Sequence, residues 1–90
     1  MKRAVGPVLE SGEVASALLA ALRERNAGLQ ILDRGAYLRV SVPGRCVLRR
    51  EDVERSLGRA FRFPGDLEMV MPSFAGRIRV GDDEVVWELP

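Results

Sequence analysis

Histidine is absent from this chain of 90 residues, and cysteine occurs once, as Cys46. The lack of histidine excludes the commonest general base, the Ser/His/Asp and Cys/His catalytic arrangements, and the usual ligand of zinc, copper and non-haem iron. A single cysteine excludes an intrachain disulfide, a CxxC redox pair and a thiolate metal cage. We therefore expect no catalytic residues, no metal and no other cofactor, and the low cysteine content favours a reducing, cytoplasmic compartment.

Long apolar runs and an excess of one charge are also lacking. No stretch approaches the ~20 apolar residues of a membrane span, and residues 1–7 are not followed by the apolar run of a signal peptide. Fourteen basic and 13 acidic residues give a net charge of +1. Bulk charge therefore attracts neither nucleic acid nor an anionic membrane, and we expect neither as a partner.

The residues that are present are typical of a folded protein. Hydrophobic residues make up 47% of the chain and charged residues 30%, close to the globular average. Since 90 residues leave room for only one core, we expect a single domain over residues 1–90.

Two helices are predicted. Val14, Ala17, Leu18, Ala21 and Leu22 recur at the spacing of one helix face, and residues 26–28 offer a stop. A shorter helix is expected over residues 50–57, with a Glu51–Arg55 ion pair on its surface.

Strands are expected at residues 5–9, 29–32, 37–42, 46–48, 67–71, 77–80 and 84–89. The first is predicted to be an edge strand because it contains Pro7, and residues 33–35 join the next two in a hairpin. The order β-α-β-β-β-α-β-β-β, with short turns, predicts a small two-layer α+β fold of mainly antiparallel strands with two short helices.

Few residues suggest chemistry. The acidic run 82–84 is better interpreted as a solvated turn than as a calcium site, because calcium needs about six oxygens at alternating positions. Glu51, Asp52 and Glu54 are interpreted as a polar helix face. Cys46 lies in an apolar run and is expected to be a buried core residue.

Arginines on two hairpins suggest a platform for single-stranded nucleic acid. Arg77 and Arg79 alternate along one strand and Arg34 and Arg39 lie on the other hairpin, with Tyr37 or Phe74 available for stacking. The nearly zero net charge and the lack of an RNP-like motif argue against this interpretation.

Segment 70–74 (Val70, Met71, Pro72, Ser73 and Phe74) is the most informative stretch. It is apolar, contains a proline, and lies where a strand should end. Methionine adapts to varied partners, so the segment has the character of a recognition surface, although Met69 and Met71 could equally fill the core.

Five motifs run nearly from end to end of the chain: VGPVL (5–9), DRGAYLRV (33–40), LGRAF (57–61), DLE (66–68) and SFAGRI (73–78). In this order and spacing they resemble the small regulatory proteins, also called effector or coupling proteins, of soluble bacterial multicomponent diiron monooxygenases. The similarity is greatest to the toluene and alkene monooxygenase branch.

The resemblance implies a function without catalysis. Such proteins carry no cofactor, bind the diiron hydroxylase component over its active site, and couple NADH oxidation to hydroxylation of an aromatic or alkene substrate. It also implies that Val70, Met71, Pro72, Ser73 and Phe74, together with Arg77, form the hydroxylase interface, and that the free protein is a monomer.

The alternative function is a nucleic-acid-binding domain that uses the surface arginines. A small hydrolase or isomerase conflicts with the missing histidine.

Overall fold

The computed structural model describes residues 3–90; Met1 and Lys2, the start of the stretch considered for a signal peptide, lie outside the described residues. In order, the elements are β1 (Ala4–Glu10), α1 (Glu13–Arg25), β2 (Gln30–Asp33), β3 (Tyr37–Pro43), β4 (Arg45–Arg49), α2 (Arg50–Leu57), α3 (Gly65–Glu68), β5 (Ser73–Ala75), β6 (Arg77–Val80) and β7 (Glu84–Glu88). This mixture of helices and antiparallel strands confirms the α+β class.

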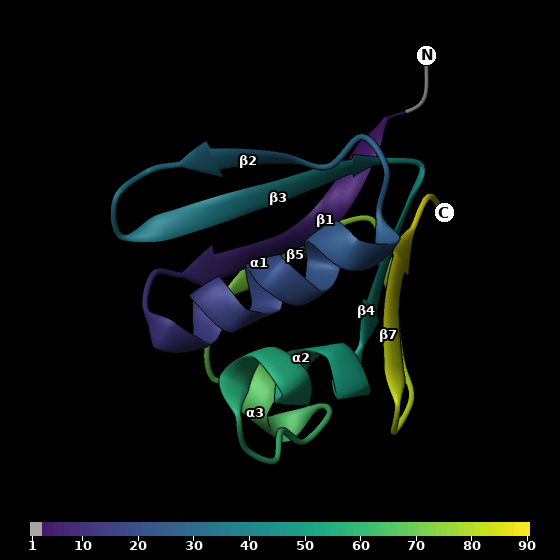
Figure 1. Ribbon diagram of the computed structural model, residues 1–90. Coiled ribbons are helices and arrows are strands. Elements are labelled where there is room, and N and C mark those ends of the chain that lie inside the picture. Colours follow the sequence, from purple (N-terminus) through teal and green to yellow (C-terminus); the bar gives the residue numbers. More distant parts are fainter. Residues whose placement is uncertain (1–2) are drawn as a thin grey trace.

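The strands form two sheets, with strand orders β2-β3-β1-β5 and β4-β7-β6, and their pairings are antiparallel. In Figure 1 the first sheet lies at the top with α1 running beneath it, while β4 and β7 stand at the side. Helices α2 and α3 lie below α1, on the side away from β2 and β3. Helix α1 therefore lies between the first sheet and the other two helices.

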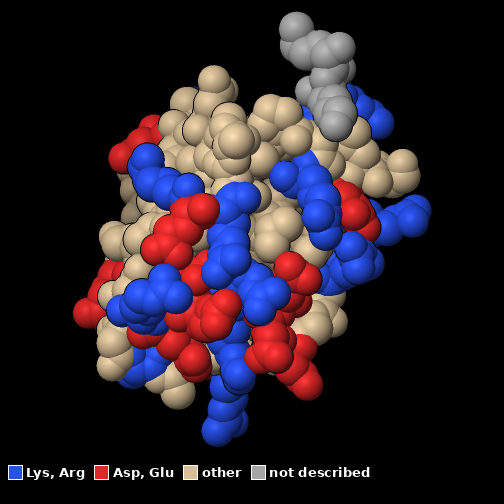
Figure 2. Space-filling view, turned by 45° about the vertical axis from the view of Figure 1, so that its right-hand side comes forward, with Lys and Arg blue, Asp and Glu red and all other residues tan. Residues whose placement is uncertain are grey.

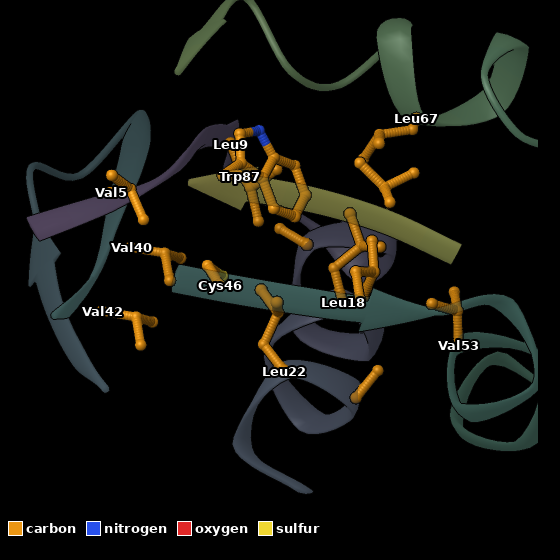
Figure 3. Close-up of a cluster of buried hydrophobic side chains, with 14 of the residues drawn as sticks. Val5, Leu9, Leu18, Leu22, Val40, Val42, Cys46, Val53, Leu67 and Trp87 are labelled. Atoms are coloured by element: carbon orange, nitrogen blue, oxygen red, sulfur yellow. The ribbon is translucent and has the colours of Figure 1, made fainter. Parts of the chain in front are cut away.

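Side chains from both sheets and from α1 meet in one core. Leu9, Leu18, Leu22, Leu48 and Trp87 are fully buried there, and Figure 3 shows Trp87 beside Leu9 with Leu18 and Leu22 approaching from α1. Each such side chain contributes about 1.5–3 kcal/mol by leaving water. Cys46 is also buried at 0% exposure, which confirms its predicted place.

Both predicted helices form. In α1 the spacing buries Ala17, Leu18, Ala21 and Leu22. Helix α2 has the expected bounds and ends at Gly58, whose φ of 79° is left-handed and whose N–H donates to the Glu54 carbonyl at 2.8 Å. Glycine adopts this conformation without the steric cost of a Cβ.

The prediction that strand 5–9 lies at a sheet edge is wrong, because β1 lies between β3 and β5. Its register with β3 pairs Val5 with Val42 and Val8 with Arg39 but skips the two residues between them. Pro7, which has no N–H, falls in this gap. The backbone of β3 also approaches Gly6 so closely that a Cβ there would lie 2.5 Å from the Val40 carbonyl oxygen. An interrupted ladder thus admits a proline into an interior strand.

The prediction of a strand at residues 67–71 is also wrong. Residues 65–68 form the short helix α3, the third helix of a fold predicted to have two. The Asp66 carboxylate accepts the Arg62 N–H at 2.8 Å, and the Glu68 N–H donates to the Pro64 carbonyl at 2.9 Å. Leu67 is buried at 1% exposure while Met69 is 77% exposed, so these residues do not share a face.

Candidate functional site

Segment 70–74 is held against the end of β1 by its backbone. The Glu10 N–H donates to the Val70 carbonyl at 2.8 Å, and the Val70 N–H donates to the Leu67 carbonyl at 3.1 Å. The side chains of Val70 and Met71 are half-buried against the core. The start of the segment is therefore fixed by both α3 and β1.

The second half of the segment is exposed. Pro72 and Ser73 are on the surface, and the Phe74 ring is 41% exposed although it lies opposite Pro7 in the β1–β5 ladder. Strand β5 lies at the edge of its sheet, so Phe74 has a neighbouring strand on one side only. The backbone thus fixes an aromatic ring that remains accessible to a partner.

Gly76 and Arg77 continue the surface into the second sheet. Gly76 has φ 100°, and a Cβ there would lie 2.7 Å from Val5 Cγ1, so only glycine fits this close crossing. Arg77 is exposed, and although it lies opposite Glu88, the Glu88 carboxylate instead pairs with Arg79 at 2.8 Å and Arg45 at 3.8 Å. Within residues 3–90, Arg77 forms no ion pair.

Met69 extends this surface, although it was not among the residues predicted for the interface and its pattern was equally compatible with a place in the core. At 77% it is more exposed than any other large hydrophobic side chain among residues 3–90. The strand expected over residues 67–71 had put Met69 on the same face as Leu67, which is buried. Pro64, Gly65 and Asp66, which favour a helix start, are the signal that could have revealed α3 and with it the exposure of Met69.

Charge is distributed unevenly over the molecule. Figure 2 shows the face over β4, β7 and α2, where arginines and acidic side chains intermingle. Its ion pairs include Arg50–Asp83 at 2.8 Å and Arg49–Glu84 at 3.9 Å. By contrast, residues 69–76 carry no charged side chain. This uncharged stretch therefore differs from the surface over β4, β7 and α2, where ion pairs are frequent.

The family of the chain follows from its sequence as a whole. The model of the MmoB/DmpM family matches residues 3–88. The chain belongs to this family. Over 85 residues it is 36% identical to the effector subunit of the alkene monooxygenase system of Xanthobacter autotrophicus, an alignment that covers 92% of this chain and 83% of that protein. The resemblance to monooxygenase regulatory proteins is thereby confirmed.

Two solved structures of phenol hydroxylase–regulatory protein complexes contain chains with the same fold as this MmoB/DmpM protein. One matches with a TM-score of 0.86 at 24% identity, covering 99% of this chain and 100% of the other. The second matches with a TM-score of 0.81 at 26% identity, covering 96% and 99%. The similarity therefore extends over nearly the whole length of each chain.

The buried carboxylate of this MmoB/DmpM protein is Asp52, which was wrongly interpreted as part of an exposed polar face. Its side chain is fully buried and accepts hydrogen bonds from Arg25 Nε at 2.6 Å and Arg55 Nη2 at 3.3 Å. The hydrogen bond from Arg25, more than any other contact, lowers the pKa of Asp52. The carboxylate thus joins α1 to α2.

The predicted Glu51–Arg55 ion pair does not form: Glu51 pairs with arginines outside α2, and Arg55 pairs with Asp52 within α2 and with Glu24 of α1. Glu51 contacts Arg25 at 3.4 Å and Arg49 at 3.6 Å, while Arg55 contacts Glu24 at 3.1 Å. Helix geometry alone suggested a pair within α2, but the arginine at the end of α1 lies closer. These charges hold α2 in place and are separate from segment 70–74.

The arginines proposed as a nucleic-acid platform come from strands of two different sheets. Arg39 lies on β3 of the first sheet, whereas Arg77 and Arg79 lie on β6 of the second. Arg79 is also engaged with Glu88. Since a binding groove needs cations aligned along one track, this arrangement weighs against the alternative function.

The remaining candidates show no sign of chemistry. Asp82 and Asp83 are exposed in the turn before β7, as expected, and residues 3–90 contain no group of three or more metal-ligating side chains arranged for an ion. Burial raises the pKa of the Cys46 thiol to about 12. No helix in the described part of the chain is long and apolar enough to cross a membrane.

Proposed function

We propose that this protein is the cofactorless regulatory subunit of a multicomponent monooxygenase. It binds the diiron hydroxylase component and tunes the active site, so that NADH oxidation is coupled to hydroxylation of an aromatic or alkene substrate. The observation that carries the proposal is membership of the MmoB/DmpM family together with the 36% identity to an alkene monooxygenase effector subunit. The reducing cytoplasm is the proposed compartment, in keeping with a single buried thiol.

Segment 70–74 and Arg77 are the proposed contact with the hydroxylase. Support comes from the exposure of Pro72, Ser73 and Phe74 on a backbone that α3 and β1 hold in place. A surface fixed before binding loses little conformational freedom when the complex forms. Arg77 stands at the end of the segment with its guanidinium unpaired within residues 3–90, suited to a carboxylate of the partner.

The regulation is a shift between conformations of the hydroxylase. A protein that binds one hydroxylase conformation more tightly than another moves that equilibrium by the difference in its two binding free energies. No residue of the regulatory subunit has to enter the reaction. Its contribution is therefore set by the fit of its surface to the favoured conformation.

Replacing the Phe74 ring tests the contact. We expect Phe74→Ala to weaken hydroxylase binding roughly tenfold, because exposed aromatic side chains are frequent hot spots of interfaces. The matched control is Leu32→Ala, which removes a side chain of 46% exposure from edge strand β2. Binding is measured by titration against the purified hydroxylase and stability by thermal unfolding. If both variants bind alike, or if Phe74→Ala loses stability in proportion to binding, the segment is not the contact.

A further inference from the structure

A hollow of about 180 Å³ lies beside segment 70–74 and shares Val70 with it. Its apolar lining comes from α1, α2, the loop after α2 and the end of α3: Val14, Leu57, Ala60, Phe61, Met69 and Val70. In Figure 1, α1 lies above α2 and α3, which places these parts of the chain around one end of the helical layer. The hollow and the segment therefore form one continuous surface.

The charged groups at the hollow already have partners within the chain. Arg59 pairs with Glu13 at 2.9 Å, and the Asp66 carboxylate accepts the Arg62 N–H at 2.8 Å. A charged ligand would have to compete with these contacts. The lining thus favours an apolar occupant over a polar one.

The volume limits the occupant to a single group. A cavity of ~150 Å³ holds one benzene molecule, so this hollow accommodates one side chain the size of leucine or phenylalanine. Met69 stands at its edge with 77% of its surface exposed. An unbranched methionine at that place can move to close around an inserted group.

We propose that this hollow is a socket for one large apolar side chain of the hydroxylase, inserted when segment 70–74 docks. The inference rests on the proposed function, because the hollow is linked to the proposed contact through Val70, which belongs to both. It identifies the partner group by chemistry: an aliphatic or aromatic side chain that projects from the hydroxylase surface beside the contact with Phe74.

Filling the socket from within tests the proposal. Val14 is half-buried in the first turn of α1 and lines the hollow, so Val14→Phe places a ring where the partner's side chain would insert. We expect hydroxylase binding to weaken by roughly tenfold or more. The control is Ala20→Phe, which adds the same ring at an exposed position of the same helix outside the hollow. This control is expected to bind as the unaltered protein does.

The comparison with Phe74→Ala separates this proposal from the proposed function. If Phe74→Ala loses binding and a folded Val14→Phe does not, the socket is refuted and the function stands. If neither variant loses binding, the contact through segment 70–74 fails and the socket fails with it.

A small fluorinated label gives a second measurement that does not depend on the fold of Val14→Phe. Ala60→Cys introduces an exposed thiol at the hollow, whereas native Cys46 is fully buried. We expect the fluorine NMR signal of a trifluoromethyl label there to shift on addition of hydroxylase and to stay unchanged with toluene alone. No shift with hydroxylase, or an equal shift with toluene alone, would overturn the proposal; the latter indicates a site for free hydrocarbon.

Discussion

Gly76 is the residue at which the chain passes from the first sheet to the second. With φ at 100° and its Cα facing Val5 and the Glu88 carbonyl, it leaves no room for a side chain. We predict that Gly76→Ala destabilises the protein by about 1–3 kcal/mol, through backbone strain and the clash. Urea unfolding measures this. Gly65→Ala, in α3 with open space around the added Cβ, is the control and should be neutral or slightly stabilising. Equal changes in the free energy of unfolding would show that the crossing at residue 76 does not require glycine.

Asp52 gives a prediction about pH. Its lowered pKa means that the carboxylate stabilises the fold fully above the unfolded value, about 3.9, and that this stabilisation disappears as pH falls through the lower folded value. Asp52→Asn should therefore cost about 1–3 kcal/mol at neutral pH. The difference from the unaltered protein should shrink below about pH 4, as measured by urea unfolding across pH.

Glu51→Gln is the matched control for Asp52→Asn. Glu51 contacts the same Arg25 at 3.4 Å, but its side chain is 59% exposed. An exposed pair is screened by water, so its loss should change stability by less than about 1 kcal/mol. Equal losses from the two variants, or a difference that grows as the pH falls, would show that Asp52 does not act as a buried ionised group.

At the scale of elements, Asn26 joins the end of α1 to the free edge of β4. Its side-chain amide donates to the Leu22 and Val47 carbonyls at 2.7 and 2.8 Å and accepts the Val47 N–H at 2.8 Å. We predict that Asn26→Ala costs about 2–3 kcal/mol, since several hydrogen bonds are lost. Amide exchange at Val47 should accelerate selectively. The exposed Arg23→Ala is the control, and an equal cost for both would refute this role.

Much of the secondary structure could be predicted because its signals are local. Helix α1 follows from apolar spacing alone, and the β2–β3 hairpin from the turn at residues 33–35. Strand β1 was misplaced at an edge because proline usually marks edges, whereas here the β3 ladder skips it. Residues 67–71 were misjudged because Leu67, Met69 and Met71 alternate as in a strand. The alternation outweighed the helix-start signal at residues 64–66, and the backbone bonds that close α3 show that the helix forms.

The candidate site was predictable in part. The apolar character of segment 70–74 is visible in the sequence, but the exposure of Phe74 depends on β5 lying at the sheet edge. Asp52 could not be recognised as buried, because its burial depends on Arg25 arriving from another helix 27 residues away in sequence. Contacts between distant elements were thus the information that local patterns lacked.

At the scale of the whole molecule, the separation of charged and uncharged surface predicts a weak response to salt. The contact proposed here is mostly apolar, so raising the salt concentration from about 50 to 200 mM should lower hydroxylase affinity by less than roughly tenfold. A nucleic-acid complex with several phosphate contacts would lose about 10³-fold or more over the same range. Binding titrations at the two salt concentrations, with hydroxylase and with single-stranded DNA, distinguish these outcomes.

The regulatory function is tested most directly by measuring how tightly NADH oxidation is coupled to substrate hydroxylation. The protein is titrated into its purified hydroxylase with reductase, NADH and an aromatic or alkene substrate, and product formed per NADH consumed is followed. We predict a rise that saturates near one regulatory subunit per active site. No change in rate or coupling, with a folded protein and an active hydroxylase, would contradict the regulatory function.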